Sequence, residues 1–508
     1  MGSYFIRSAA SIGLNAVPVS VEVDVASGLP KFTIVGLPDV AISESRDRVR
    51  AAIKNSGFTF PRTRVTVNLA PADIKKQGPA YDLPIAIGLL AASGLLVGND
   101  SLRNLVFLGE LALDGRVRPV SGILLAALMT REIKASGIVV AVENAAEAEL
   151  VAGLTVHPIG SLAEFACLHN SNEPLPIFEH VKRKRAKRKV YEDMSSIKGQ
   201  EFAKRALEIA AAGGHNVLLS GPPGAGKTML ARALPGILPD LNFDEALEIT
   251  KIFSVAGLRT SSDALIRERP FRAPHHSSSS VSLIGGGTWP KPGEVSLAHR
   301  GVLFLDEFPE FSRSAIENLR QPLEDGVVTI SRAAGTLEFP AQFTLVAAMN
   351  PCPCGNLSDP QKPCVCTPSQ VNKYQQKMSG PLMDRIDLAV EVPRIDFKEL
   401  TGINSAESSK EIRARIESAR ALQRDRFAGS GISMNSELRS KLLREYCQLD
   451  AEGLEIIKTA MERFRLSARA YTRVLKVSRT IADLEGTESI TTSHLAEALN
   501  YRPQVKSE

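Results

Sequence analysis

A glycine-rich turn between an apolar run and a helix-forming run is the feature that most limits what this chain can be. Residues 217–238 read VLLSGPPGAGKTMLARALPGIL and match the pattern G-x-x-x-x-G-K-[ST]. In such a strand–loop–helix the backbone N–H groups surround phosphates, the lysine reaches the β- and γ-phosphates, and the hydroxyl meets Mg²⁺. A glycine-rich turn with an incidental lysine is the alternative. The pattern predicts an ATP site with Thr228 at the Mg²⁺, formed by Gly221, Pro222, Pro223, Gly224, Ala225, Gly226, Lys227, Thr228 and Met229.

Two later apolar runs end in polar residues, GVLFLDE at 301–307 and FTLVAAMN at 343–350. Near-continuous apolar runs suit strands covered on both faces, so they predict central strands of a doubly wound ATPase core. We expect Asp306 to hold the Mg²⁺ shell and Glu307 to orient the attacking water. Asn350 is expected to hydrogen-bond the γ-phosphate or the water, and a turn-forming asparagine before proline is the alternative.

Two arginines are candidates to stabilise the charge that develops during phosphoryl transfer. Arg385, in GPLMDRIDLAVEV, lies so far along the sheet that a neighbouring subunit's nucleotide is its best-placed target. An ion pair with Asp384 or Asp387 is the alternative. Arg469 lies in the first turn of a helix and projects off the apolar stripe of that helix, so it is free to reach phosphate. Arg473 competes for this role, and a plain surface cation is the remaining alternative.

The pattern of apolar and charged residues divides the 508 residues into four parts. Residues 1–170 alternate strand-like and helical runs and predict an α/β domain. Residues 171–195 form a polar connector with seven basic and four acidic side chains, either a solvated linker or a phosphate contact. Residues 196–395 form the ATPase core, and residues 396–508 are charged and helical, as in a lid.

The bulk composition narrows the class of protein further. The longest apolar stretch begins at Leu83, contains glycines, and is too short to span a membrane, so we expect a buried helix. No charged segment precedes an apolar one at the start, which favours a cytoplasmic protein without membrane contact. The net charge of +5 is not concentrated in any one of the predicted domains. A few placed loops, and no bulk polycation, would therefore have to contact DNA.

Four of the six cysteines are clustered in NPCPCGNLSDPQKPCVCTP. Two C-x-C pairs facing one another provide four sulfurs, which suits a closed structural Zn²⁺ site without catalysis. Reduced thiols, disulfides or a cluster are the alternatives. The candidate zinc ligands are Cys352, Cys354, Cys364 and Cys366.

Five segments together resemble one family: GPPGAGKT, FRAPHHSSSSVSLIGGG, GVLFLDE, AAMNPCPCG and SGPLMDRIDL. They are similar to the magnesium-chelatase-like AAA+ ATPases, and within them to the competence protein ComM (YifB) group, over nearly the whole chain. The resemblance implies an AAA+ P-loop core with a helical lid, a homo-hexameric ring, and ATP at the subunit interfaces. It also implies that Arg385 acts in trans as an arginine finger, Arg469 as a lid sensor and Asn350 as a strand-end sensor.

The family also implies an activity. It implies a DNA helicase that extends recombination intermediates by branch migration during natural transformation, with other recombination factors as further partners. The chelatase name follows from sequence likeness and does not imply a porphyrin enzyme. Two other functions compete: a chelatase-type motor that acts on a partner protein, and an ATP-gated scaffold that recruits other factors.

The N-terminal domain resembles the proteolytic domain of Lon, a ribosomal protein S5 domain 2-like fold, with two departures. Ala80 stands where that family carries its serine nucleophile, and Leu124 stands where its lysine would lie. A Ser–Lys dyad needs a hydroxyl and an amine, which methyl and isobutyl groups do not supply. We therefore expect no proteolysis, and a role as a scaffold for the ring or as a DNA-contacting collar.

Two segments between the catalytic strands are candidate DNA contacts. Residues 271–301 are rich in Ser, Gly and His, and residues 325–342 predict a β-hairpin. In the family they correspond to the helix-2 insert and the pre-sensor hairpin, which point toward the pore. Ordinary subunit packing is the alternative for each. Adjacent histidines on one strand would point to opposite faces, which disfavours a metal at that pair. The candidate contacts to phosphates are Lys291, Arg332, His275 and His276.

Overall fold

The computed structural model describes residues 3–97, 99–179, 192–258, 265–287, 290–332, 335–359, 361–378, 380–395 and 407–502. Most of the basic run of the predicted connector, residues 180–191, lies outside these ranges. The chain divides into two compact units, Met1–Lys187 with Ala246–Ile266, and Arg188–Glu245 with Arg267–Glu508. Within the described ranges, every helix is too short or too polar to cross a membrane.

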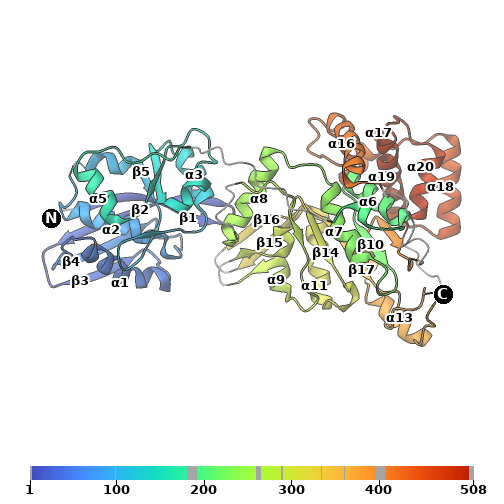
Figure 1. Cartoon of the computed structure of the whole chain (residues 1–508), viewed down its shortest axis with the longest axis horizontal. Helices are drawn as coiled ribbons and strands as arrows, with labels where there is room; N and C mark the ends of the chain where they lie inside the picture. Colours follow the sequence, from blue (N-terminus) through green and yellow to red (C-terminus); the bar gives the residue numbers. More distant parts are fainter. Residues whose placement is uncertain are drawn as a thin grey trace. The chain divides into compact units, whose positions relative to one another are not determined.

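The N-terminal unit is built on a seven-stranded mixed sheet of order β3-β4-β2-β1-β5-β8-β9. Figure 1 labels the first five strands of the chain in this sheet, β1 to β5. Strands β1 and β2 form an antiparallel hairpin, and β5, β8 and β9 continue the sheet in parallel. From Val19 to Val25, strand β2 buries every second residue, as one covered face requires. The strands are β1 (Ser3–Ile12), β2 (Asn15–Ala26), β3 (Lys31–Val35), β4 (Arg64–Ala70), β5 (Leu105–Phe107), β8 (Gly137–Ala141) and β9 (Val156–Ile159), with a small pair β6 (Glu110–Leu111) and β7 (Val117–Arg118).

The helices of this unit include one that is buried on all sides. All the residues of α2 (Asp82–Ala92) are buried, which confirms that the long apolar stretch is a buried helix. Its first residue, Asp82, is held by Arg48, whose Nε lies 2.7 Å from the Oδ2 of Asp82. The other helices are α1 (Val40–Asn55), α3 (Ile123–Glu132), α4 (Ala145–Ala148) and α5 (Leu162–Asn170).

Helix α8 (Phe243–Ala256) differs from the expected domain division. Residues 246–266 group with the N-terminal unit, whereas the sequence placed them in the ATPase core. Leu247 packs against the apolar cluster that contains Leu124, and Ser254 Oγ donates a hydrogen bond to Glu147 Oε1 at 2.5 Å. These apolar and polar contacts account for the difference from the expected boundary.

The second unit contains a parallel sheet of order β11-β14-β17-β10-β18 (Figure 1). Every residue of β14 and β17 is buried, which confirms the two predicted central strands. The strands are β10 (Val217–Ser220), β11 (Phe271–Arg272), β14 (Val302–Leu305), β17 (Thr344–Met349) and β18 (Leu388–Glu391). The helices of the core are α6 (Glu201–Gly213), α7 (Lys227–Ile237), α9 (Ser280–Ile284), α10 (Glu294–Leu297), α11 (Arg313–Asn318), α12 (Arg320–Asp325), α13 (Pro368–Gln376) and α14 (Gly380–Met383).

The two segments between catalytic strands form hairpins. The insert, residues 271–301, contains α9, α10 and a short pair of β12 (Gly285–Gly286) with β13 (Lys291–Pro292). The predicted β-hairpin is confirmed: β15 (Val327–Arg332) pairs antiparallel with β16 (Gly335–Pro340). The mixed α/β class and the parallel sheet of the core are likewise as expected.

The predicted helical C-terminal part is confirmed. Its helices share one apolar cluster with α6 and α7 of the core. Polar contacts reinforce this packing, because Arg420 donates to the carbonyl of Ala211 at 2.8 Å and Gln423 donates to that of Ala212 at 3.1 Å. The helices are α16 (Ser409–Arg426), α17 (Ser440–Tyr446), α18 (Ala451–Phe464), α19 (Ala468–Leu484) and α20 (Thr492–Asn500).

Candidate functional site

The carboxyl ends of three neighbouring parallel strands bring the predicted ATP-site residues together. Strand β17 lies between β10 and β14, with Ser220 opposite Met349 and Leu305 opposite Ala347. The residues that follow these strands therefore meet at one edge of the sheet, where ligands bind in open α/β folds. They are the glycine-rich loop, Asp306 and Asn350.

The glycine-rich loop, Gly221–Thr228, takes its shape from three glycines. Gly224 and Gly226 have φ angles of 79° and 93°, which side chains rarely adopt. A Cβ on Gly221 would lie 2.1 Å from the carbonyl oxygen of Val392, so only glycine fits beside the strand β18 end. Helix α7 begins at Lys227, immediately after this turn, so its N-terminal N–H groups face the space a phosphate would occupy.

Lys227 is the best-placed cation of the site. Its Nζ lies 2.6 Å and 2.9 Å from the carbonyl oxygens of Gly221 and Pro222, and 3.2 Å from Oδ1 of Asn350. Burial lowers the pKa of Lys227, and the nearby charge of Asp306 opposes this shift. The ammonium is thus held inside the loop next to Asn350, where a β- or γ-phosphate would replace the carbonyl contacts.

Thr228 and Asp306 bring two oxygen ligands together. The Thr228 hydroxyl donates to Oδ2 of Asp306 at 3.0 Å. Mg²⁺ prefers carboxylate and hydroxyl oxygens and keeps several waters, so this pair fits the metal of a Mg²⁺–ATP complex. Two ligands are what a metal shared with substrate phosphates requires. We therefore assign no further protein ligand.

The neighbouring carboxylate of Glu307 points elsewhere. Glu307 has a left-handed backbone with φ 49°, and its Oε2 lies 3.1 Å from Nδ1 of His276 in the insert. The expectation that His275 and His276 point to opposite faces is wrong, since their ring centroids are 4.1 Å apart. Strand β11 ends at Arg272, and the N–H of Ser278 bonds the carbonyl of His275 at 2.9 Å. The histidines thus lie in a turn, without the alternation of a strand.

Arg385 lies among other charged side chains. Its guanidinium forms an ion pair with Glu324, in place of the Asp384 or Asp387 partner weighed from the sequence, and the side chain is only 10% exposed. Burial lowers the pKa of Arg385, and the positive charges of Arg320 and Arg469 add to the shift. Several cations therefore share this face, a suitable environment for an anion.

The structure separates the two competing lid arginines. Arg473 donates to the carbonyl of Met383 at 2.9 Å and also to that of Ile386, so backbone acceptors hold it. Arg469 makes a 3.1 Å ion pair with Asp384, and its side chain is 62% exposed. An exposed surface pair contributes little to stability, so Arg469 is the arginine that can change partners at small cost.

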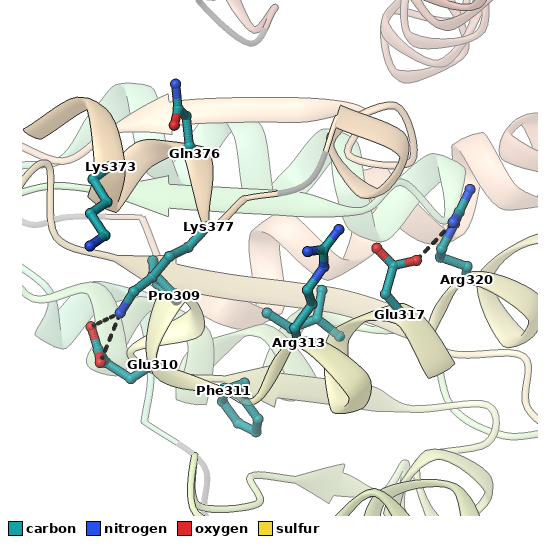
Figure 2. Close-up of a pocket in the computed structure, with 10 residues that line it drawn as sticks. Pro309, Glu310, Phe311, Arg313, Glu317, Arg320, Lys373, Gln376 and Lys377 are labelled. Atoms are coloured by element: carbon teal, nitrogen blue, oxygen red, sulfur yellow. Dashed lines mark hydrogen bonds and ion pairs between the residues drawn. The ribbon is translucent and has the colours of Figure 1, made fainter.

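A pocket of about 910 Å³ lies on the surface formed by α11, α12 and α13. Figure 2 shows two ion pairs in it, Lys377 with Glu310 at 3.3 Å and Arg320 with Glu317 at 2.7 Å, with Arg313 between them. Arg320 is one of the charges that act on Arg385. The pocket therefore adjoins the surface that carries Arg320, Arg385 and Arg469, which we call the arginine face. No sequence pattern indicated this pocket.

The four clustered cysteines meet in space. Their sulfurs all lie within 4.8 Å of one another, with Cys352 to Cys354 at 3.4 Å and Cys354 to Cys364 at 3.6 Å. Tetrahedral Zn–S bonds of about 2.3 Å place sulfurs about 3.8 Å apart, so the set fits Zn²⁺. Backbone N–H groups, first that of Asn356 and then that of Val365, lower the pKa of Cys354 to about 6. The backbone N–H of Cys366 acts to lower the pKa of Cys364, but burial and the neighbouring thiols Cys354 and Cys352 outweigh it and raise the pKa of Cys364, so the four thiols ionise unequally. The thiolate is the form that binds metal.

The cysteine loop, residues 351–367, touches the phosphate loop. A Cβ on Gly355 would lie 2.6 Å from Cδ of Pro223, so the two loops are in close contact at this glycine. Gln375 of the helix that follows donates to the carbonyl of Pro351 at 3.1 Å. The sequence placed this loop beside Asn350 but gave no signal for its contact with the phosphate loop.

The candidate DNA contacts lie on the hairpins and turns described above. Lys291 is exposed in β13, and Arg332 ends β15 opposite Gly335, close to the hairpin turn, as predicted. The side chain of Arg332 lies outside the described part of the structure. His276 faces Glu307, and His275 Nδ1 lies 2.7 Å from the Ser277 hydroxyl.

The two positions predicted to correspond to a Ser–Lys dyad, Ala80 and Leu124, lie against one apolar cluster. Leu124 is fully buried, and Ala80 packs against the same apolar cluster. The backbone N–H of Leu124 donates to Oε1 of Glu147 at 3.0 Å. The two side chains offer neither a nucleophile nor a base.

One further residue, Gln200, lies near the phosphate loop and was not predicted from the sequence. Gln200 has a left-handed backbone with φ 60°, and its Nε2 donates to the carbonyl of Pro393 at 2.6 Å. A second, longer contact of 3.4 Å reaches the carbonyl of Ala225 inside the loop. Gln200 therefore ties the loop to the chain after β18, and no local sequence pattern signals this role.

Comparison with protein families gives matches along most of the chain. Residues 193–400 match the magnesium chelatase subunit ChlI model, and residues 21–144 match the model described as subunit ChlI of Mg-chelatase. Residues 406–502 match the C-terminal model of magnesium chelatase subunit ChlI.

Two relatives align with the chain from end to end, and a third aligns with part of it. Competence protein ComM of Haemophilus influenzae is 44% identical over 100% of this chain and 98% of its own length. The uncharacterized protein YifB of Escherichia coli is 44% identical over 99% of this chain and 97% of its own. The magnesium-chelatase 67 kDa subunit of Chlorobaculum parvum is 29% identical over 31% of this chain and 23% of its own.

Proposed function

The chain belongs to the magnesium-chelatase-like ComM/YifB family of AAA+ proteins, and from this premise we propose that it is an ATP-driven hexameric DNA helicase. Its role would be branch migration of recombination intermediates during natural transformation. The printed name of the Haemophilus influenzae relative, a competence protein, supports that biological setting.

One observation carries the ATPase part of this proposal. At the ends of three parallel strands, Lys227 contacts Asn350 at 3.2 Å and Thr228 contacts Asp306 at 3.0 Å. The cation reaches the phosphates, the oxygens hold Mg²⁺ when it is bound, and Glu307 orients the attacking water. Mg²⁺ would supply charge neutralisation between the phosphates.

A ring of subunits is supported by the arginine face. In one chain Arg385 is paired with Glu324, and its neighbours Arg320 and Arg469 are also positive. The phosphates of an adjacent subunit's nucleotide would compete with Glu324 for Arg385. Arginine supplied in trans stabilises the phosphoryl-transfer transition state by about 10³-fold or more.

The DNA part of the proposal depends on the insert and the β15–β16 hairpin. Lys291 and Arg332 lie on these hairpins, and contacts to phosphates without base readout suit a motor that ignores sequence. The N-terminal unit would act as a proteolytically inactive scaffold or collar. The cysteine loop would be pinned by a structural Zn²⁺ held by four thiolates, without catalysis.

A forked-DNA strand-displacement and branch-migration assay tests the helicase. We expect ATP-dependent displacement and DNA-stimulated ATP hydrolysis, both lost in Lys227→Ala. Mixing Lys227→Ala with Arg385→Ala chains should restore part of the hydrolysis, because one mixed interface then carries an intact loop and an intact finger. Hydrolysis by a lone subunit, indifferent to Arg385 and to DNA, would refute this proposal.

Two other functions remain as alternatives. The match to the magnesium-chelatase 67 kDa subunit favours a chelatase-type motor that acts on a partner protein. It covers only 31% of this chain, whereas the competence protein matches end to end. Partner-dependent hydrolysis that ignores DNA would select the chelatase type. An ATP-gated recruitment scaffold would bind partners on ATP binding without displacing any strand.

A further inference from the structure

Arg385 lies in a turn between α14 and β18, outside any helix or strand. Arg473 of the lid donates to the carbonyls of Met383 and Ile386 in this turn. The carbonyl of Arg385 itself accepts from Nδ2 of Asn216 at 3.0 Å. A guanidinium that must meet a transferring phosphate needs its backbone fixed, because a displacement of about 1 Å can cost about 10²-fold in rate. The contact with Asn216 therefore bears directly on Arg385.

Asn216 joins this turn to the central strand β17. It immediately precedes β10, and β10 pairs with β17 on one side and with β18 on the other. On the β17 side, Oδ1 of Asn216 accepts from the N–H of Leu345 at 2.9 Å. One side chain at the start of β10 thus connects β17 to the turn that carries Arg385.

The chemistry of this position calls for an amide. Strand β17 presents an N–H and the turn presents a carbonyl, so the side chain between them must accept on one side and donate on the other. Asparagine does both, whereas aspartate only accepts and leucine does neither. Asn216 is half-buried, so a partner lost at either end leaves a polar group that water reaches incompletely.

The main chain of Asn216 makes separate contacts, which hold β18 in place. Its carbonyl accepts from the N–H groups of Asp387 and Leu388 at 3.0 Å each, and its N–H donates to Oδ2 of Asp387 at 3.0 Å. Nδ1 of His215 lies 3.5 Å from the same carboxylate oxygen. None of these contacts uses the amide of Asn216. Loss of the amide therefore loosens the turn at Arg385 and leaves β18 paired.

We propose that Asn216 is a positioning residue that fixes the backbone of Arg385 for phosphoryl transfer. The two ends of β10 then serve two nucleotides. The phosphate loop at the carboxyl end binds the subunit's own ATP, and Asn216 at the amino end holds the arginine that reaches the neighbour's. This inference rests on the proposed function, which assigns Arg385 to an adjacent subunit's ATP.

The first measurement is ATP hydrolysis by the full-length protein. Asn216→Asp keeps the acceptor for Leu345 and removes the donor to Arg385, so we expect kcat to fall about tenfold with the KM for ATP unchanged. Asn216→Ala replaces this variant if it loses its cooperative thermal transition.

Asn144→Asp is the matched control in the N-terminal unit. Oδ1 of Asn144 accepts from the N–H of Val120 at 2.9 Å, and its Nδ2 donates to the carbonyl of Val120 at 3.0 Å, so its amide has the same two kinds of backbone partner. This variant should keep the kcat of the unmodified protein. A kcat for Asn216→Asp and Asn216→Ala equal to that of the control would overturn the proposal.

A double-mutant cycle separates an action through Arg385 from a general weakening of the fold. Asn216→Asp added to Arg385→Ala should lower kcat by less than about twofold further, because the side chain that Asn216 positions is already absent. A further loss of about tenfold in the double variant would show that Asn216 acts independently of Arg385, against the proposal.

Mixtures of variant chains then locate the defect. Asn216→Asp mixed with Lys227→Ala should regain hydrolysis, because the intact phosphate loop of one chain meets the intact arginine turn of the other. Asn216→Asp mixed with Arg385→Ala should regain none, and a gain there would place the defect in the variant's own phosphate loop and refute the proposal. If Lys227→Ala mixed with Arg385→Ala regains nothing, the trans role in the proposed function is wrong, and the double-mutant cycle still decides whether Asn216 acts through Arg385.

Discussion

Lys76 in the N-terminal unit and Lys227 in the ATPase unit share the same local chemistry. Both are buried, both donate to carbonyl oxygens of a nearby loop, and burial lowers the pKa of each. Their surroundings differ. Lys227 contacts Asn350 at 3.2 Å and lies within the field of Asp306, whereas Lys76 bonds Pro71 and has Asp73 as the charge that acts on it.

The difference shows what makes a buried lysine functional. At Lys227 several polar groups from separate strands converge on one point, so a phosphate can displace the loop carbonyls without leaving the ammonium unpaired. At Lys76 the ammonium donates to the carbonyl of Pro71, a residue of the same short segment. A buried lysine is thus a binding residue only when partners from other strand ends surround it.

Replacement of the two lysines gives the largest expected contrast. Lys227→Ala should lower ATP hydrolysis by about 10²–10³-fold, because the charge opposite the transferring phosphate is lost. Lys76→Ala should leave the hydrolysis rate per folded molecule unchanged while lowering the thermal midpoint. Steady-state ATPase assays with matched calorimetry compare them. Equal losses of hydrolysis in both variants would break the comparison.

A lysine introduced at the apolar position of Leu124 in the N-terminal unit can be compared with the native buried lysine, Lys227, of the ATPase unit. Ala80→Ser combined with Leu124→Lys restores the residue types of a Ser–Lys dyad but buries an amine among aliphatic side chains. We expect a loss of about 3 kcal/mol or more in the free energy of unfolding, and no cleavage of casein with ATP. Denaturant unfolding and a protease assay measure the two outcomes. Cleavage by the variant alone would contradict the expected loss of structure at these positions, and cleavage by the unmodified protein would mean that the dyad positions are misassigned.

The cysteine loop sharpens the comparison in a different way, because its expected stabilisation comes from a metal. We expect about one zinc per chain by elemental analysis, and less than about a tenth of that in Cys352→Ser with Cys364→Ser. Cys167→Ser, an exposed cysteine in the N-terminal unit, is the matched control and should keep the full metal content. Equal zinc content in the unmodified protein, the double variant and Cys167→Ser would show that the metal is not bound by this loop.

The smallest expected effect is a pH dependence of opposite sign in the two units. Burial raises the pKa of Asp82, although Arg48 opposes it, so the stabilisation by this group is present at low pH and is lost as the pH rises through its folded-state pKa. Burial also acts to raise the pKa of Asp387, but bonding by His215 and by the N–H of Asn216 outweighs it and lowers the pKa. Its stabilisation is present above pH 4 and is lost as the pH falls through the lowered pKa.

Thermal midpoints of Asp82→Asn and Asp387→Asn, measured from about pH 3 to 7, test these signs. The advantage of the unmodified protein over Asp82→Asn should shrink as the pH rises, and its advantage over Asp387→Asn should grow, each by about 1.4 kcal/mol per pKa unit. Parallel trends in the two variants would contradict the opposite pKa shifts.

Much of the ATPase unit was predictable because its signals are local. The phosphate loop, the buried strands ending at Asp306 and Asn350, and the β15–β16 hairpin each carry a pattern in a short window. Strand β1 was not identified, because SYFIRSAASI is rich in small polar residues that blur a period-two pattern. The grouping of residues 246–266 with the N-terminal unit depends on long-range packing that no window contains.

The contacts between functional residues were less predictable than their identities. The pairing of His276 with Glu307 joins the turns that follow two neighbouring strands, β11 and β14, so it could not be predicted before the order of the strands was known. The partner of Arg385 is Glu324, which comes from a different helix, whereas the sequence suggested its immediate neighbours. Residue types at strand ends are encoded locally, but their partners depend on how the strands are ordered.

The contact between Gly355 and Pro223 makes the conformation of the phosphate loop depend on that of the cysteine loop. The loop expected to bind Zn²⁺ lies against the glycine-rich loop expected to surround the phosphates. A chelator that removed this zinc would then inhibit ATP hydrolysis slowly without binding at the nucleotide site. A shortage of zinc would weaken the binding of ATP in the same way.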